Sequence, residues 1–284
     1  MKKRLPILFS GLLAVSFLSL AVTIPNNGGT EPEKEAVIMQ AVVKNLERYH
    51  FDPANINDDF SRRTYDFFLN DLDGARLFFT QEDLAQLIQY RDQLDDESVT
   101  GTFTFFDKSQ ELHQAARTKT QVWYREILAK PFDLDEKATF TALDEESDWT
   151  ANDKELREYW YGYLKRDALR RITNKLEEQE KRLNPDPEEV AEEKEESDEE
   201  KEEEPILTLE EIEEEVRADI LKTYDRWYDR LEKAKRSQRL SQYINAFTAM
   251  YDPHTNYYRP RDKENFDIRF SGRLEGIGAT LQTD

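Results

Sequence analysis

The sequence contains no cysteine among its 284 residues. It therefore has no disulfide bond, no thiolate nucleophile and no metal site built from thiolates, and its N-terminal leader has no cysteine for lipid attachment. The histidines are also few. His50, His113 and His254 are far apart in the sequence, and none has the H-E-x-x-H spacing of a zinc peptidase. The sequence indicates no metal site and no cofactor.

Glycine and proline are scarce, with 9 and 10 residues. Because both interrupt regular helices, their scarcity favours long helices over a sheet of many strands. The sequence has no G-x-S-x-G motif, no P-loop and no other glycine-rich phosphate loop. Paired carboxylates are frequent, but chance explains them in a chain with 61 acidic residues. We therefore predict no catalytic residue in this sequence.

Positive charge is in deficit, since 40 Lys and Arg accompany 61 Asp and Glu and the formal net charge is -21. A chain of this charge repels phosphate, which argues against nucleic acid as a partner. Residues 188–204 contain 12 acidic residues and 2 lysines, a net charge of -10. Such density predicts a disordered acidic insert at 185–205 between two helices. The alternative is a run that binds calcium or a basic partner, although calcium requires carboxylates held in a folded loop.

A long apolar run occurs at the N-terminus, where Lys2, Lys3 and Arg4 precede Leu5–Leu18. Small residues follow at the positions that signal peptidase reads. We interpret residues 1–24 as a Sec-type signal peptide and 25–32 as a linker. The alternative is an inner-membrane anchor formed by residues 5–24, which approaches the length of about 20 residues needed to span a bilayer. Both interpretations place the remainder in the periplasm or cell envelope, with membrane contact only through the leader.

Residues 33–251 carry apolar side chains at helical spacing, which predicts a mostly α, antiparallel helical domain with short loops. The expected helix starts are Glu33, Asp58 or Asp59, Thr80, Phe103, Asn152 or Asp153, Thr208 and Ser237. Thr80 and Thr208 each open a capping box, and the helix after Thr80 is expected to continue through Leu94. Most of the 16 Phe, 13 Tyr and 4 Trp lie on helix faces and are assigned to the core. A minority lining a groove for unfolded substrate is the alternative.

The helical pattern ends at Asp252-Pro253-His254-Thr255-Asn256-Tyr257, because Pro253 disfavours helical geometry at Asp252. About twenty residues later comes Leu274-Glu275-Gly276-Ile277-Gly278-Ala279. The two motifs together resemble the junction of tail-specific proteases, the carboxy-terminal processing peptidases. A less specific likeness includes Phe51-Asp52, the helix from Tyr65 to Leu72, Trp160 with its helix, and the stretch from Gln242 to Leu281.

This resemblance implies a helical N-terminal domain, then a PDZ domain, then a serine-lysine peptidase core. Residues 252–284 would be the junction and the truncated start of the PDZ domain, including its first β-strand. In the family the catalytic serine and lysine lie beyond the position of Asp284. The resemblance therefore implies the front part of an envelope serine-type endopeptidase, without its catalytic residues, that holds substrates and docks partners. The alternative is a secreted, non-enzymatic helical adaptor.

The resemblance also assigns a binding site for protein C-termini to Leu274, Gly276, Ile277 and Gly278. The Gly-Ile-Gly turn would bind the terminal carboxylate through its backbone amides, and Leu274 would contact the terminal apolar side chain. The alternative is a plain tight turn that enters a strand. His254 is interpreted as a turn residue and not as a catalytic one. The implied partners are protein substrates with apolar C-termini and an envelope adaptor protein.

Overall fold

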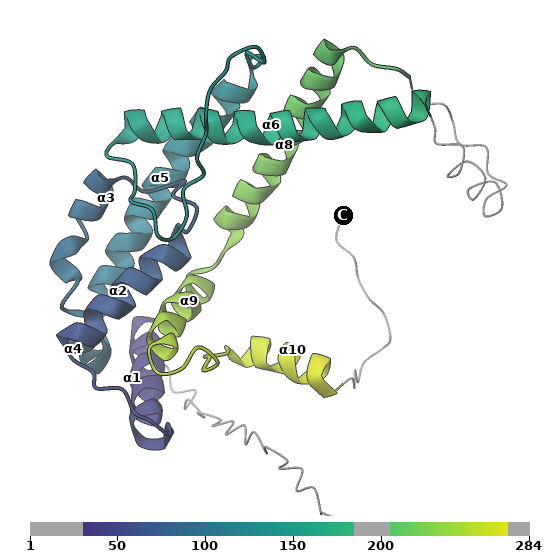
Figure 1. Ribbon diagram of the computed structural model, residues 1–284. Helices are drawn as coiled ribbons and strands as arrows, with labels where there is room; N and C mark the ends of the chain where they lie inside the picture. Colours follow the sequence, from purple (N-terminus) through teal and green to yellow (C-terminus); the bar gives the residue numbers. More distant parts are fainter. Residues whose placement is uncertain (1–30, 185–204, 272–284) are drawn as a thin grey trace, which may run out of the picture.

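The computed structural model describes residues 31–184 and 205–271, and Figure 1 shows their arrangement. The helices are α1 (Glu31–Tyr49), α2 (Asp58–Leu72), α3 (Gln81–Ala85), the 3-10 helix η1 (Ile88–Tyr90), α4 (Leu94–Thr100), α5 (Thr104–Leu128), α6 (Asp153–Leu183), α8 (Leu209–Lys233), α9 (Arg236–Ala249) and α10 (Pro260–Ser271). No strand occurs in these two ranges, so the prediction of a mostly α fold is confirmed for them. The leader, the acidic insert except Pro205, and the expected PDZ strand lie outside the described residues.

Two apolar clusters form the core. The first joins α1, α2, α4 and α9 with the beginning of α5, and the second joins α5, α6 and α8. Figure 1 shows α6 running across both α5 and α8, and α9 continuing from the lower end of α8. The long helix α5 contributes to both clusters, which ties the two ends of the domain together.

The segment that follows α2 also links the clusters. Phe79 is buried in the first cluster, whereas Leu77 and Phe78 are buried in the second. The indole Nε1–H of Trp160, at the centre of the second cluster, donates a 2.7 Å hydrogen bond to the carbonyl oxygen of Leu77. A buried indole N–H normally finds such a partner, and here that partner fixes the loop against α6.

The helix starts agree with the sequence in most places. The capping boxes at Thr80 and Thr208 are both present, and Asn152 caps α6. The N-cap of α2 is one or two residues earlier than the predicted Asp58 or Asp59, because the side chain of Asn57 accepts the N–H of Phe60. Asp58 and Asp59 instead occupy the first turn, where negative side chains stabilise the helix by interacting with the positive end of its dipole.

The prediction of one helix from Thr80 through Leu94 is wrong. After α3 ends at Ala85, the N–H groups of Leu87, Tyr90 and Gln93 bond three residues back, so the chain continues as 3-10 turns. These tighter turns keep Leu87 buried and leave its neighbour Ile88 55% exposed. The expectation of short loops also fails at residues 129–152, a long connection between α5 and α6 that contains no helix.

The structure has the helix α10 in the region that the sequence predicts as a junction. Figure 1 shows α10 projecting away from the other helices, and most of its described side chains are exposed. The ring of Phe266 contacts that of Tyr258, with 5.3 Å between their centroids. Across the parts of the chain that the structure describes, no helix has both the length and the apolarity to cross a bilayer.

Gly101 ends α4 in the left-handed region with φ +73°, and a Cβ atom there would lie 2.6 Å from the Cβ of Ala36 on α1. We expect Gly101→Ala to lower the free energy of unfolding by about 2 kcal/mol, through backbone strain and overlap with α1. Urea unfolding measures this change. Gly101→Asn should cause less backbone strain than Gly101→Ala, because asparagine tolerates the left-handed region. An alanine variant as stable as the parent would contradict the close packing of α4 on α1.

Candidate functional site

The residues predicted from the sequence to bind a C-terminus, Leu274, Gly276, Ile277 and Gly278, lie outside the described residues. The upstream motif is described. The N–H of His254 donates a 2.7 Å hydrogen bond to Oδ1 of Asp252, and the His254 ring nitrogen Nδ1 lies 3.0 Å from the same oxygen. The imidazole is exposed to solvent. This arrangement agrees with the interpretation of His254 as a turn residue.

The same motif is attached to α9 through Asn245. The Asn245 side chain accepts the N–H of Tyr257 at 2.7 Å and donates to the carbonyl oxygen of Tyr257 at 3.3 Å. This two-way amide contact fixes the position at which the chain leaves the helical domain. In the described region the motif therefore acts as an anchored turn.

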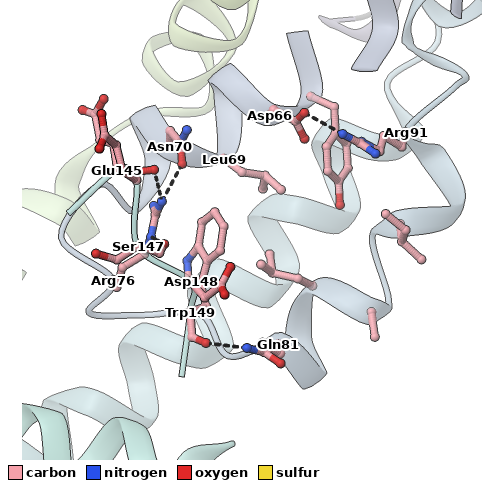
Figure 2. Close-up of a pocket in the computed structure, with 15 residues that line it drawn as sticks. Asp66, Leu69, Asn70, Arg76, Gln81, Arg91, Glu145, Ser147, Asp148 and Trp149 are labelled. Carbon is pink, nitrogen blue, oxygen red and sulfur yellow. Dashed lines mark hydrogen bonds and ion pairs between the residues drawn. The ribbon is translucent and has the colours of Figure 1, made fainter. Parts of the chain in front are cut away.

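A pocket of about 540 Å³ lies between α2, the α3–η1 segment and residues 145–149 of the α5–α6 connection (Figure 2). Its volume is in the range of ligand-binding sites. Its apolar lining comes from Leu69 on α2, from two aromatic rings and from three aliphatic side chains of the α3–η1 segment. Those further lining residues are Tyr65, Trp149, Leu84, Ala85 and Ile88. Of the two rings, Tyr65 is buried in the first apolar cluster and Trp149 is half-buried.

Arg76 fixes one wall of the pocket. It is buried and adopts φ +57°, in the left-handed region that non-glycine residues rarely occupy. Its guanidinium donates to the carbonyl oxygens of Glu145 at 2.7 Å and Ser147 at 3.0 Å, and to Oδ1 of Asn70 at 2.9 Å. It also lies over the Trp149 ring, 3.6 Å from the centroid. The arginine therefore binds the connecting segment to α2, as Figure 2 shows.

The buried residue Asp73 forms hydrogen bonds that hold the same wall of the pocket. Its buried carboxylate accepts the N–H groups of Leu77 at 2.7 Å, Phe78 at 3.1 Å and Phe79 at 2.9 Å, together with the indole N–H of Trp149 at 3.2 Å. Burial raises the pKa of Asp73 to about 6, although the N–H donors oppose this change. At neutral pH the carboxylate is still ionised and accepts all of these hydrogen bonds.

Sequence reasoning identified residues 73–76 only as a turn. The N–H of Arg76 does bond to the carbonyl oxygen of Asp73, which confirms that turn. The contacts of Arg76 and Asp73 to residues 145–149 span about seventy positions, and no spacing in the sequence signals them. The only signal in the sequence was an arginine three residues after the aspartate of an Asp-Gly turn that ends a helix.

The rim of the pocket carries unequal charge. Glu145, Glu146 and Asp148 are exposed, and none forms an ion pair with a residue that the structure describes. At the other end of the pocket, Arg91 is paired with Asp66 at 2.7 Å. Figure 2 shows Glu145 on one side and the pair of Asp66 and Arg91 on the other, with Trp149 between them.

The pocket has the chemistry of a binding site. Ser147 Oγ donates to Oδ1 of Asp144 at 2.8 Å. Burial raises the pKa of Tyr65, so its phenol stays neutral. No group of acidic and histidine residues suited to a metal ion occurs in the described parts of the chain. The arrangement can bind an apolar group beside charged or polar ones.

The family model for the tail-specific protease N-terminal domain matches residues 42–261. A curated relative, the tail-specific protease of Haemophilus influenzae, is 22% identical over 253 residues. That match covers 89% of this chain and 31% of the relative, so the chain spans about a third of that protein's length. The matched region contains α2 to α9 and both sides of the pocket.

Proposed function

The chain belongs to the family of tail-specific protease N-terminal domains, and from this premise we propose that it holds substrate and docks partners for an envelope serine peptidase. The observation that supports holding is the apolar pocket, in which the exposed side chains of Ala85 and Ile88 lie with the half-buried ring of Trp149. An extended chain offers the apolar side chains that such a surface buries, whereas a folded protein keeps them inside. The parent peptidase would process proteins from their C-termini.

The remaining features of the proposal concern the ends of the chain. Residues 1–24 would export the protein to the periplasm, and residues 252–284 would lead into a PDZ domain. Leu274, Gly276, Ile277 and Gly278 would capture an apolar C-terminus in the manner of PDZ domains. The Ser-Lys dyad of the parent would supply hydrolysis, with a lysine whose pKa is lowered by burial acting as base.

Substrate holding is tested with one protein in two states. We expect the purified chain to bind reduced, carboxymethylated ribonuclease and not native ribonuclease, measured by fluorescence anisotropy. Ile88→Ala should weaken that binding about tenfold, because the exposed Ile88 side chain lines the pocket and loses its contact area. Val122→Ala is the matched control, since Val122 is similarly exposed on α5 and is absent from the pocket lining. Equal binding of both ribonuclease states, or equal loss in both variants, would overturn the proposal.

A further inference from the structure

The carboxylates at the rim define which polypeptide segments the pocket accepts. We propose that the pocket recognises an internal segment in which an apolar side chain lies next to lysine or arginine. This inference rests on the proposed substrate-holding function, and it adds the chemical class of the segment that is held.

The apolar half of the site is preformed. Leu84 is half-buried and Ala85 and Ile88 are exposed on one side, and the Trp149 ring lies on the other. The Trp149 ring is fixed on one face by Arg76 and at its nitrogen by Asp73. A side chain that enters between these walls loses its contact with water without first rearranging the pocket, which lowers the entropy cost of binding.

The segment that carries the charged half of the site is held through hydrogen bonds to its backbone carbonyl groups. The carbonyl oxygens of Glu145, Ser147 and Trp149 accept hydrogen bonds from Arg76 and Gln81. Glu145, Glu146 and Asp148 therefore belong to a segment whose backbone is held beside the apolar wall, and Figure 2 labels Glu145 and Asp148 there. Because the backbone of this segment is held, less freedom is lost when its carboxylates attract a cationic side chain.

The arginines in the pocket lining cancel only part of this charge. The guanidinium of Arg76 donates hydrogen bonds to carbonyl groups and Asn70 and attracts Glu145 and Asp148, and that of Arg91 is paired with Asp66. Four carboxylates and two guanidinium groups line the pocket, which leaves a net charge of -2 there. A free C-terminal carboxylate is repelled by this rim, so the site selects an internal, basic segment and not a chain end.

Three labelled peptides test the inference on the full chain. All are acetylated and amidated, carry fluorescein and contain Leu-Phe-Leu, and they differ in flanking residues, which are Lys, Gln or Glu. We expect the Lys peptide to bind about tenfold more tightly than the Gln peptide, and the Glu peptide to bind most weakly. The preference for Lys should decrease in 0.5 M salt because added ions screen exposed charges.

Two triple variants separate the rim from the overall charge of the chain. Glu145→Gln/Glu146→Gln/Asp148→Asn should abolish the preference for Lys over Gln and leave urea unfolding unchanged. Glu177→Gln/Glu178→Gln/Glu180→Gln removes the same charge from exposed positions on α6 and should retain the preference. Equal loss in both triple variants would overturn the inference, since it would indicate attraction by the net charge alone.

The outcomes also distinguish the inference from the function on which it rests. If the three peptides bind equally and Ile88→Ala weakens all of them, the pocket holds substrate without charge selection and the inference is wrong. If no peptide binds and Ile88→Ala has no effect on unfolded ribonuclease, the proposed substrate-holding function itself is wrong.

Discussion

Replacing Asp73 by alanine is expected to lower the free energy of unfolding by about 3–5 kcal/mol, the cost typical of removing one partner from a buried charged network. The carboxylate satisfies the backbone N–H groups of Leu77, Phe78 and Phe79, and alanine leaves all three without their acceptor. A buried donor that loses its acceptor costs about 1–3 kcal/mol. The buried guanidinium of Arg76 also loses the carboxylate that attracts it most strongly.

The matched control for this variant is Asp133→Ala. The Asp133 carboxylate also accepts two backbone N–H groups, those of Asp135 and Glu136, but Asp133 is exposed and water replaces it. We expect a loss below about 1 kcal/mol there, as for most surface substitutions. Urea unfolding followed by circular dichroism gives both values. Equal losses in the two variants would mean that Asp73 acts only as a local turn residue.

The same substitution should also disturb the pocket. Asp73→Ala removes the acceptor of the Trp149 indole N–H, so the ring keeps only its contact with Arg76 and its packing against the first apolar cluster. Because Trp149 forms one wall of the pocket, peptide binding should weaken even at temperatures where the variant is fully folded. The stability of the link between the two cores and the shape of the proposed site thus depend on one carboxylate.

The parts of the fold that the sequence predicted are those determined by local interactions. Helical spacing of apolar residues identified α5, α6 and α8, and the Thr208 capping box gave the start of α8. These signals need only neighbours within one or two turns. The helix expected from Thr80 through Leu94 failed because its apolar spacing also suits successive short turns, and tertiary packing of Leu87 and Leu94 selected those turns.

The candidate site was less accessible to sequence reasoning. Its walls come from residues 65–91 and 145–149, and the contacts between them are made by Arg76 and Gln81 to backbone carbonyls. A carbonyl acceptor has no side-chain signature, so no residue pattern predicts such a contact. The sequence instead directed attention to residues 274–278, which carry the more specific motif and remain a prediction.

His113 should make the stability of the domain depend on pH. It is buried on α5 against Phe78 and Phe79, and its Nε2 atom has no hydrogen-bond partner among the described residues. Burial, and secondarily the charges of Arg117 and Arg239, lower the pKa of His113 from 6.5 to about 3. The folded state therefore keeps this imidazole neutral at a pH where the unfolded chain binds a proton. Its contribution to stability is present above pH 6.5 and is lost as the pH falls toward 3.

Asp73 has the opposite dependence. The pKa of Asp73 is higher in the folded state, about 6 against an ordinary value of 3.8, so the fold binds this proton more readily than the unfolded chain. Its contribution increases as the pH falls from 6 to 4, with a limiting slope of about 1.4 kcal/mol per pH unit. Over that range the slope from His113 has the same size and the opposite sign. The free energy of unfolding of the unmutated chain should therefore change little with pH through this pair of residues. The effect of His113 must be measured as the difference between the unmutated chain and a His113 variant.

We expect His113→Phe to become more stable relative to the parent by about 3 kcal/mol when the pH is lowered from 7 to 4. Phenylalanine retains an aromatic ring between Phe78 and Phe79 and has no proton to bind, whereas the contribution of Asp73 is the same in both proteins and cancels. Urea unfolding of both proteins at both pH values gives the difference. His254→Phe is the control, because that imidazole is exposed, and its change should stay below about 1 kcal/mol. A His113→Phe difference that does not vary with pH would show that the folded domain accepts a charged imidazole between its two cores.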